Sequence, residues 1–153
     1  GKLIFSGPGE WSDRLTKLLV QIPTDYVLYA QEDHWPVKSP PNLSEMLKIV
    51  SENDLFRLQL GMVNRFYTLS GSKIPLFFDP NSKYLVSHQP SIWKKSFLLD
   101  CLKPNETPWE NEYKGTLRWQ QTGQLREFIR EKIAIWPCDW YRHMCIKGKT
   151  VES

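Results

Sequence analysis

The sequence predicts one α/β domain, in which a sheet is flanked by helices. The chain has 153 residues, of which 41% are hydrophobic and 24% are charged, and these values are typical of a globular domain that buries its own core. Its first part predicts a strand over residues 2–5, a helix from Trp11 that ends at Pro23, and a strand from Tyr26. This order of elements is typical of an α/β sheet, and we expect the strand from Tyr26 to lie at its centre.

The spacing of apolar residues predicts the first helix. Leu15, Leu18, Leu19 and Ile22 fall on one face of it, and Ser12 is the expected N-cap. The helix therefore packs one apolar face against the sheet.

The later elements follow from local patterns of apolar residues and breakers. Residues 55–60 alternate between apolar and polar side chains, which predicts a strand with one solvent-exposed face. The other predicted elements are a helix over residues 44–51, irregular hairpin structure over 61–83, a short strand over 84–87, a helix from Ile92, a helix from Pro108, a helix over 124–135 and a last strand over 141–146.

Charge and cysteine content exclude several classes of protein. The net charge of +3 is too small to indicate a nucleic-acid partner, because such proteins normally carry clustered basic residues. Cys101, Cys138 and Cys145 are odd in number and lack zinc-site spacing, so we expect no disulfide framework and a reducing, cytoplasmic compartment. No apolar run in the sequence reaches the roughly 20 residues that a transmembrane helix needs.

Two adjacent carboxylates follow the strand from Tyr26. Glu32 and Asp33 come at the carboxyl end of this strand, where open α/β sheets bind ligands. The pair can hold a divalent cation, which can in turn hold a diphosphate. The alternative is that both acids cap a turn and stay solvated. Three prolines between Trp35 and Pro41 predict an irregular loop beside them.

Glu110 and Glu112 belong to a second acidic stretch. Thr107 is the expected N-cap of a helix and Pro108 its first residue, so one interpretation is that the acids simply stabilise the helix start. The other interpretation is that these carboxylates lie at the same end of the sheet as the first acidic pair and serve one site with it.

Two motifs occur in a recognisable order along the chain. Residues 27–33 form a strand that ends in acids, and residues 88–97, 108–112 and 115–118 form a later segment rich in Trp and acids. The first motif resembles the acidic metal motif of GT-A-fold glycosyltransferases, of the family 2 type, and the second is similar to their acceptor segment. The resemblance covers about residues 10–120.

The resemblance implies a GT-A-like fold with a mixed, mainly parallel sheet, of which this single domain over residues 1–153 is the later part. It implies metal-assisted, inverting transfer of a sugar from a UDP-, GDP- or dTDP-sugar to a hydroxyl of a glycan, lipid-linked or protein acceptor. Mn²⁺ or Mg²⁺ is the expected cofactor.

Carried over by position, the resemblance assigns roles to individual residues. Asp33 is the expected ligand of the metal and the diphosphate, Glu32 assists it, and His143 is a late metal ligand. Glu110 is the expected general base that deprotonates the acceptor hydroxyl, with Glu112 as the second choice. The residues expected to bind donor or acceptor are His34, Trp35, His88, Gln89, Trp93, Trp109, Arg118 and Lys147.

Departures from the family pattern leave other functions open. Only 25 residues precede Tyr26, so we expect another segment or subunit to supply much of the nucleotide-binding unit, and this chain to be a fragment of a larger domain. The run from Glu32 to His34 also departs from a strict Asp-X-Asp pattern. The alternative function is a non-catalytic carbohydrate- or protein-binding module. A nucleic-acid-binding domain that uses Trp stacking fits less well, because acids accompany the aromatic residues.

Overall fold

A computed structural model describes residues 3–63, 68, 74–122, 127, 129–146 and 149–150 and confirms a mixed α/β class. None of the helices in this part of the chain has the length and apolar character that crossing a membrane requires. The elements in chain order are α1 (Trp11–Leu19), β1 (Tyr26–Tyr29), β2 (His34–Pro36), α2 (Leu43–Glu52), β3 (Arg57–Gly61), β4 (Leu76–Phe77), β5 (Ser91–Lys94), α3 (Lys95–Cys101), α4 (Pro108–Gln121), β6 (Ile133–Pro137), β7 (Tyr141–His143), β8 (Cys145–Ile146) and β9 (Lys149–Thr150).

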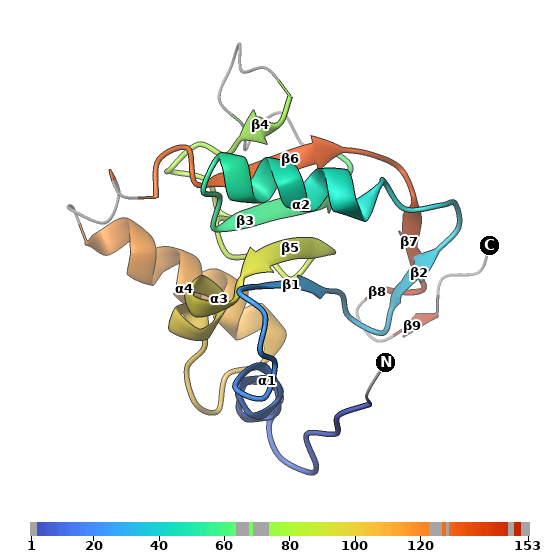
Figure 1. Ribbon diagram of the computed structural model, residues 1–153. Coiled ribbons are helices and arrows are strands. Elements are labelled where there is room, and N and C mark those ends of the chain that lie inside the picture. Colours follow the sequence, from blue (N-terminus) through green and yellow to red (C-terminus); the bar gives the residue numbers. More distant parts are fainter. Residues whose placement is uncertain are drawn as a thin grey trace.

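The main sheet has five strands in the order β1-β5-β3-β6-β4, which are stacked in this order in Figure 1. The pair β3–β6 is parallel, whereas β1–β5, β5–β3 and β6–β4 are antiparallel. The prediction of a mainly parallel sheet is therefore wrong. The strand from Tyr26 lies at an edge rather than at the centre, because β5 runs between β1 and β3 and pairs with both.

Alternating side chains build a hydrophobic core on each face of the sheet. Leu58 and Leu60 of β3 belong to a core with Met46 and Val50 of α2. Trp93 of β5 belongs to a second core, which includes residues of α1 and α3. In Figure 1, α2 lies along β3 and β6, while α1, α3 and α4 gather away from it. Since both faces are covered, β3 has no solvent-exposed face, contrary to the prediction.

The strand predicted from Tyr84 is instead a segment of turns and bends, because side chains bind its backbone groups. Nη1 of Arg57 donates to the carbonyl oxygens of Tyr84 (3.1 Å) and Leu85 (2.9 Å). The amide of Val86 donates to Oγ1 of Thr116 (3.1 Å). These bonds replace the ladder that a neighbouring strand would supply.

Further local predictions are wrong. The helix predicted from Ile92 begins only at Lys95, since Ser91–Lys94 form β5. Residues 3–5 form no strand, and Leu3 and Phe5 are each 82% exposed. Residues 133–135, predicted as the end of a helix, lie in β6, which pairs with β3 on one side and with β4 on the other. The prediction failed because the periodicity of a short apolar run does not separate a buried strand from a buried helix. Trp35 lies in the short strand β2 rather than in an irregular loop. Of the predicted hairpin region and that helix, residues 64–67, 69–73, 124–126 and 128 lie outside the described residues.

A separate two-stranded sheet joins the segment after β1 to the segment after β6. β2 pairs with β7 in antiparallel fashion, with His34 opposite His143 and Pro36 opposite Tyr141. Figure 1 shows this pair beyond the end of the main sheet. The strand predicted over residues 141–146 is thus found as β7 and β8.

Helix α4 begins at the predicted residue. Oγ1 of Thr107, the N-cap, accepts a hydrogen bond from the amide of Glu110 (3.2 Å), and Oε2 of Glu110 accepts one from the amide of Thr107 (3.0 Å). This capping box, with Pro108 at the first helical position, leaves fewer unpaired backbone donors at the helix start.

We expect Thr107→Ala to lower the free energy of unfolding by about 1 kcal/mol, because it removes the N-cap acceptor. Chemical denaturation followed by circular dichroism measures this change. The matched control is Ser51→Ala on the exposed end of α2, for which we expect a change within about 0.5 kcal/mol. Equal stability of the Thr107→Ala and wild-type proteins would contradict the role of the capping box.

Candidate functional site

Asp33, His34 and His143 form a cluster between the β1–β2 turn and β7. Atoms of these side chains that can bind a metal ion all lie within 4.8 Å of one another. Nδ1 of His143 is 3.5 Å from Oδ2 of Asp33, and Nδ1 of His34 is 3.8 Å from Oδ1 of Asp33. Strand pairing sets this geometry, because directly opposite residues of an antiparallel pair hold their side chains close together.

His143 presents Nδ1 to Asp33 in the form that binds metals. Its Nε2 lies 3.1 Å from Oε1 of Gln89, and the same oxygen accepts a hydrogen bond from the hydroxyl of Tyr141 (2.7 Å). Because an amide oxygen only accepts, Nε2 of His143 donates to it, and in a neutral ring Nδ1 is then the nitrogen that can bind a metal ion. Metal-binding histidines commonly make such a second hydrogen bond.

His34 is neutral and less ready to bind an ion. Burial lowers the pKa of His34 to about 4, although the neighbouring charge of Asp33 acts in the opposite direction. Its Nδ1 accepts a hydrogen bond from the amide of Gln31 (3.1 Å). An ion bound at Nδ1 would displace this amide, so Asp33 and His143 are the better prepared ligands.

A buried carboxylate oxygen without a partner favours a cation at the cluster. Oδ1 of Asp33 is buried and has no hydrogen-bond partner in the part of the chain that the structure describes. Unpaired buried polar atoms are uncommon in folded proteins, and an ion or a water molecule accounts for them. One carboxylate and two imidazoles can together hold a divalent transition-metal ion, whereas Mg²⁺ prefers oxygen ligands. The three residues can therefore hold a divalent cation.

Glu32 and Trp35 lie outside the cluster. Glu32 is exposed in the turn that the hydrogen bond from the amide of His34 to the carbonyl oxygen of Gln31 (3.2 Å) closes. Trp35 is 58% exposed and points to the opposite side of β2 from His34, because successive side chains of a strand alternate. Lys147 lies outside the described residues.

Three adjoining cavities extend from the cluster to α4. The histidine-side cavity has a volume of about 520 Å³, the central cavity about 330 Å³ and the helix cavity about 580 Å³. The first two share Gln59, Met62 and Gln89, and the last two share Tyr84 and Glu112. Their further lining residues are Asp139, Tyr141, Arg142 and His143 in the histidine-side cavity; Thr68, Phe78, Ser87 and Ile135 in the central cavity; and Asn81, Lys83, Trp109, Tyr113, Thr116, Leu117 and Gln120 in the helix cavity.

Of the two carboxylates near the start of α4, Glu112 faces these cavities. Its Oε1 accepts a hydrogen bond from the amide of His88 (2.6 Å), and its Oε2 has no such partner among the described residues. Glu110 lines none of the three cavities. Its hydrogen bonds with Thr107 and Lys114 hold the pKa of Glu110 below the ordinary value. The geometry therefore favours Glu112 over Glu110 as a base.

The charges of Glu32 and Glu112 both act on the hydroxyl of Tyr29. Burial raises the pKa of Tyr29 to about 12, and these two charges act in the same direction. That the two acidic stretches serve one site stays a prediction.

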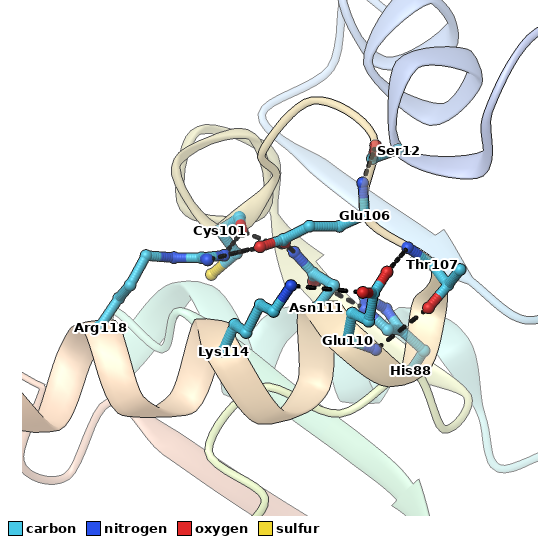
Figure 2. A network of polar contacts seen from close by, with 9 residues as sticks. All are labelled: Ser12, His88, Cys101, Glu106, Thr107, Glu110, Asn111, Lys114 and Arg118. Atoms are coloured by element: carbon cyan, nitrogen blue, oxygen red, sulfur yellow. Dashed lines mark hydrogen bonds and ion pairs between the residues drawn. The ribbon is translucent and has the colours of Figure 1, made fainter.

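Figure 2 shows the polar network that ties α4 to His88. Nε2 of His88 donates to Oδ1 of Asn111 (2.9 Å), whose Nδ2 donates to the carbonyl oxygen of Cys101 (2.8 Å) and to Oε2 of Glu106 (2.7 Å). Arg118 holds Glu106 through two hydrogen bonds of 2.7 Å and 3.0 Å. Arg118, expected to bind a ligand, is therefore a structural partner of Glu106.

Helix α1 is joined to the same network. Ser12 lies inside α1, whose N-cap is Glu10, so the predicted capping role of Ser12 is wrong. Its Oγ instead accepts a hydrogen bond from the amide of Glu106 (3.2 Å), as Figure 2 shows. Burial acts to raise the pKa of Glu106, but the hydrogen bonds from Arg118 and Asn111 and the charge of Arg118 together lower it.

Trp93 and His88 belong to the interior and not to a ligand-binding surface. They are 0% and 1% exposed, and the ring of His88 packs against Trp11 and Trp93, with centroids 4.6 Å and 6.1 Å apart. The prediction that the side chains of His88 and Trp93 contact the donor or the acceptor is therefore wrong. His88 contributes through its backbone amide, which holds Glu112.

Three residues near the cavities, Arg57, Gln59 and Tyr141, were not predicted from the sequence. The buried guanidinium of Arg57 donates through Nη2 to Oε1 of Gln59. Burial lowers the pKa of Arg57 to about 10, so this side chain stays charged at neutral pH. Tyr141 lies two positions before His143 in the same strand, so both side chains point to the same face. This spacing could have identified Tyr141 as a neighbour of His143. Nothing in the sequence indicates that Arg57 is buried, since most arginines are exposed.

Comparison of the chain with known proteins gave no family model, no curated protein and no solved structure that matches it.

His88 links the stability of the fold to pH. Burial lowers the pKa of His88 from 6.5 to about 4, although its hydrogen bond with Asn111 acts in the opposite direction. Between these two values the unfolded chain binds more protons than the folded chain. We therefore expect the free energy of unfolding to fall as the pH falls from 6.5 towards 4, with a contribution of up to about 3 kcal/mol from His88.

Chemical denaturation of wild type and His88→Gln at a series of pH values measures this effect. A glutamine amide can still donate to Asn111 but does not titrate, so the variant should lose less stability than wild type on acidification. The same dependence on pH in both proteins would contradict the assignment.

Proposed function

We propose that this chain is a glycosyltransferase that moves a sugar from a nucleotide-sugar donor to a hydroxyl acceptor. The observation that carries the proposal is the row of adjoining cavities, with His143 of the metal-binding cluster at one end and Glu112 between the central and helix cavities. The proposed transfer requires a cation site for the diphosphate and a base for the acceptor within one cleft.

Glu112 is the proposed general base. The amide of His88 fixes Oε1 of this carboxylate, while Oε2 remains free within the described part of the chain to accept a proton. The acceptor hydroxyl forms a bond to the anomeric carbon of the sugar as the bond from that carbon to the diphosphate breaks, and the hydroxyl proton passes to Glu112. This single displacement inverts the configuration of the sugar.

Asp33 and His143 are the proposed ligands of the cation, with His34 as the third. When bound, the cation offsets the negative charge that develops on the leaving diphosphate. Gln89 keeps the ring of His143 in the required tautomer. Arg142 lines the histidine-side cavity, where its guanidinium, paired with Asp139, can also contact a phosphate.

A carbohydrate-binding module without catalysis is the second candidate. Trp109 and Tyr113 are 74% and 67% exposed, and exposed aromatic rings suit the C–H faces of sugars whether or not a reaction follows. This function requires neither the cluster nor a free carboxylate oxygen, so the catalytic proposal accounts for more of the site.

A transfer assay separates the two functions. The protein is incubated with MnCl₂, a UDP-, GDP- or dTDP-activated hexose and p-nitrophenyl glycosides as acceptors, and nucleotide release and product are measured. We expect Glu112→Gln to lower transfer at least about 100-fold, because it removes the base. Glu110→Gln is the matched control and should retain transfer, because glutamine preserves the capping box.

Loss of transfer in Glu110→Gln together with full activity of Glu112→Gln would contradict the assignment of the base. A folded wild-type protein that releases no nucleotide from any of these donors would contradict the catalytic proposal and favour the binding module.

A further inference from the structure

One face of α4 lines the helix cavity along the length of the helix. Trp109, Glu112, Tyr113, Leu117 and Gln120 line this cavity, and successive steps of three and four residues bring such positions onto one helix face. The side chains of Trp109 and Tyr113 remain largely exposed. Large aromatic side chains gathered at a surface cavity are typical of a binding site rather than of a core.

The remainder of α4 is fixed, so this aromatic face is held in place. Figure 2 shows Asn111 and Arg118 joined to Glu106. Gly115 packs so closely on Val86 that an added Cβ would lie 3.3 Å from its methyl carbons. A helix that is already fixed loses little conformational entropy when a ligand binds to one of its faces.

We propose that the helix cavity binds a pyranose ring of a saccharide acceptor. The rings of Trp109 and Tyr113 pack on the C–H face of the sugar, and Asn81 and Lys83 form hydrogen bonds with its hydroxyls. This inference rests on the proposed glycosyl transfer and names the acceptor: a saccharide delivers its hydroxyl to Glu112, which the helix cavity shares with the central cavity.

The chemistry of the cavity favours a neutral polar ligand with an apolar face. Its charged lining residues are Lys83 and Glu112, which have opposite signs, so a phosphate or nucleic acid gains little from it. An alkyl chain would bury Lys83 and Glu112 without supplying hydrogen bonds, which is unfavourable. The volume of about 580 Å³ lies within the range of ligand cavities, roughly 300–1,000 Å³.

Saturation-transfer NMR and calorimetry test the proposal on the full chain. The probes are the methyl pyranosides of glucose, galactose, mannose, rhamnose and N-acetylglucosamine, together with lactose and maltose. We expect binding of one or more of these sugars, a loss of affinity of about tenfold in Trp109→Ala and in Tyr113→Ala, and a smaller loss in Trp109→Phe, which keeps an aromatic ring. Phe5→Ala, at another exposed aromatic residue that lines none of the three cavities, should leave sugar binding unchanged.

UDP with MnCl₂ is titrated in parallel, so that the two proposals can fail separately. Nucleotide binding without binding of any sugar would overturn the saccharide site, whereas it would remain consistent with the proposed glycosyl transfer. Sugar binding that is the same in Trp109→Ala as in wild type would also overturn it. Binding of hexanol at the helix cavity in place of the sugars would identify an apolar ligand and overturn it as well. Sugar binding that depends on Trp109 supports the site even where no nucleotide binds.

Discussion

The hydrogen bond from the backbone amide of His88 to Oε1 of Glu112 (2.6 Å) is the contact on which the candidate site depends. It sets which acid of α4 faces the cavities, and it does so only while the segment of His88 is fixed against the helix. Asn111 provides this attachment through the ring of His88, and Arg118 and Glu106 support Asn111 from the other side. All residues of this polar network are buried or half-buried. In such surroundings a network with all its hydrogen bonds is rigid, and the loss of one bond lowers the stability of the fold.

A buried charge stabilises the opposite wall of the same cavities. The guanidinium of Arg57 binds the carbonyl oxygens of Tyr84 and Leu85 and also Gln59. It therefore forms the bends that bring Tyr84 to the cavity wall, and it prevents the ladder of a strand there. Burying a charged side chain is unfavourable unless its donors are satisfied. The shape of the central cavity thus depends on β3, which carries Arg57 and Gln59.

Local features of the fold could be predicted from the sequence, and long-range pairing could not. The N-cap at Thr107 and the last strand with His143 depend on neighbouring residues, so local patterns identified them. The edge position of β1 depends on β5, which is distant in sequence and pairs antiparallel with both β1 and β3. For the same reason Trp93 is buried although its sequence context suggested a binding residue. Glu110 and Glu112 have the same chemistry, and the capping box of Glu110 and the hydrogen bond from the amide of His88 to Glu112 distinguish them.

In the proposed function, Asp33 and His143 hold a cation at one end of the cavities, where it binds the diphosphate of a nucleotide. Calorimetric titration of wild type, Asp33→Ala and His143→Ala with UDP, GDP and dTDP, each with and without MnCl₂, measures this binding. Glu32→Ala is the control, because Glu32 is an exposed neighbour outside the cluster. We expect nucleotide binding that requires manganese, is lost in Asp33→Ala and His143→Ala, and persists in Glu32→Ala. Equal nucleotide affinity with and without manganese, in wild type and Asp33→Ala alike, would contradict it.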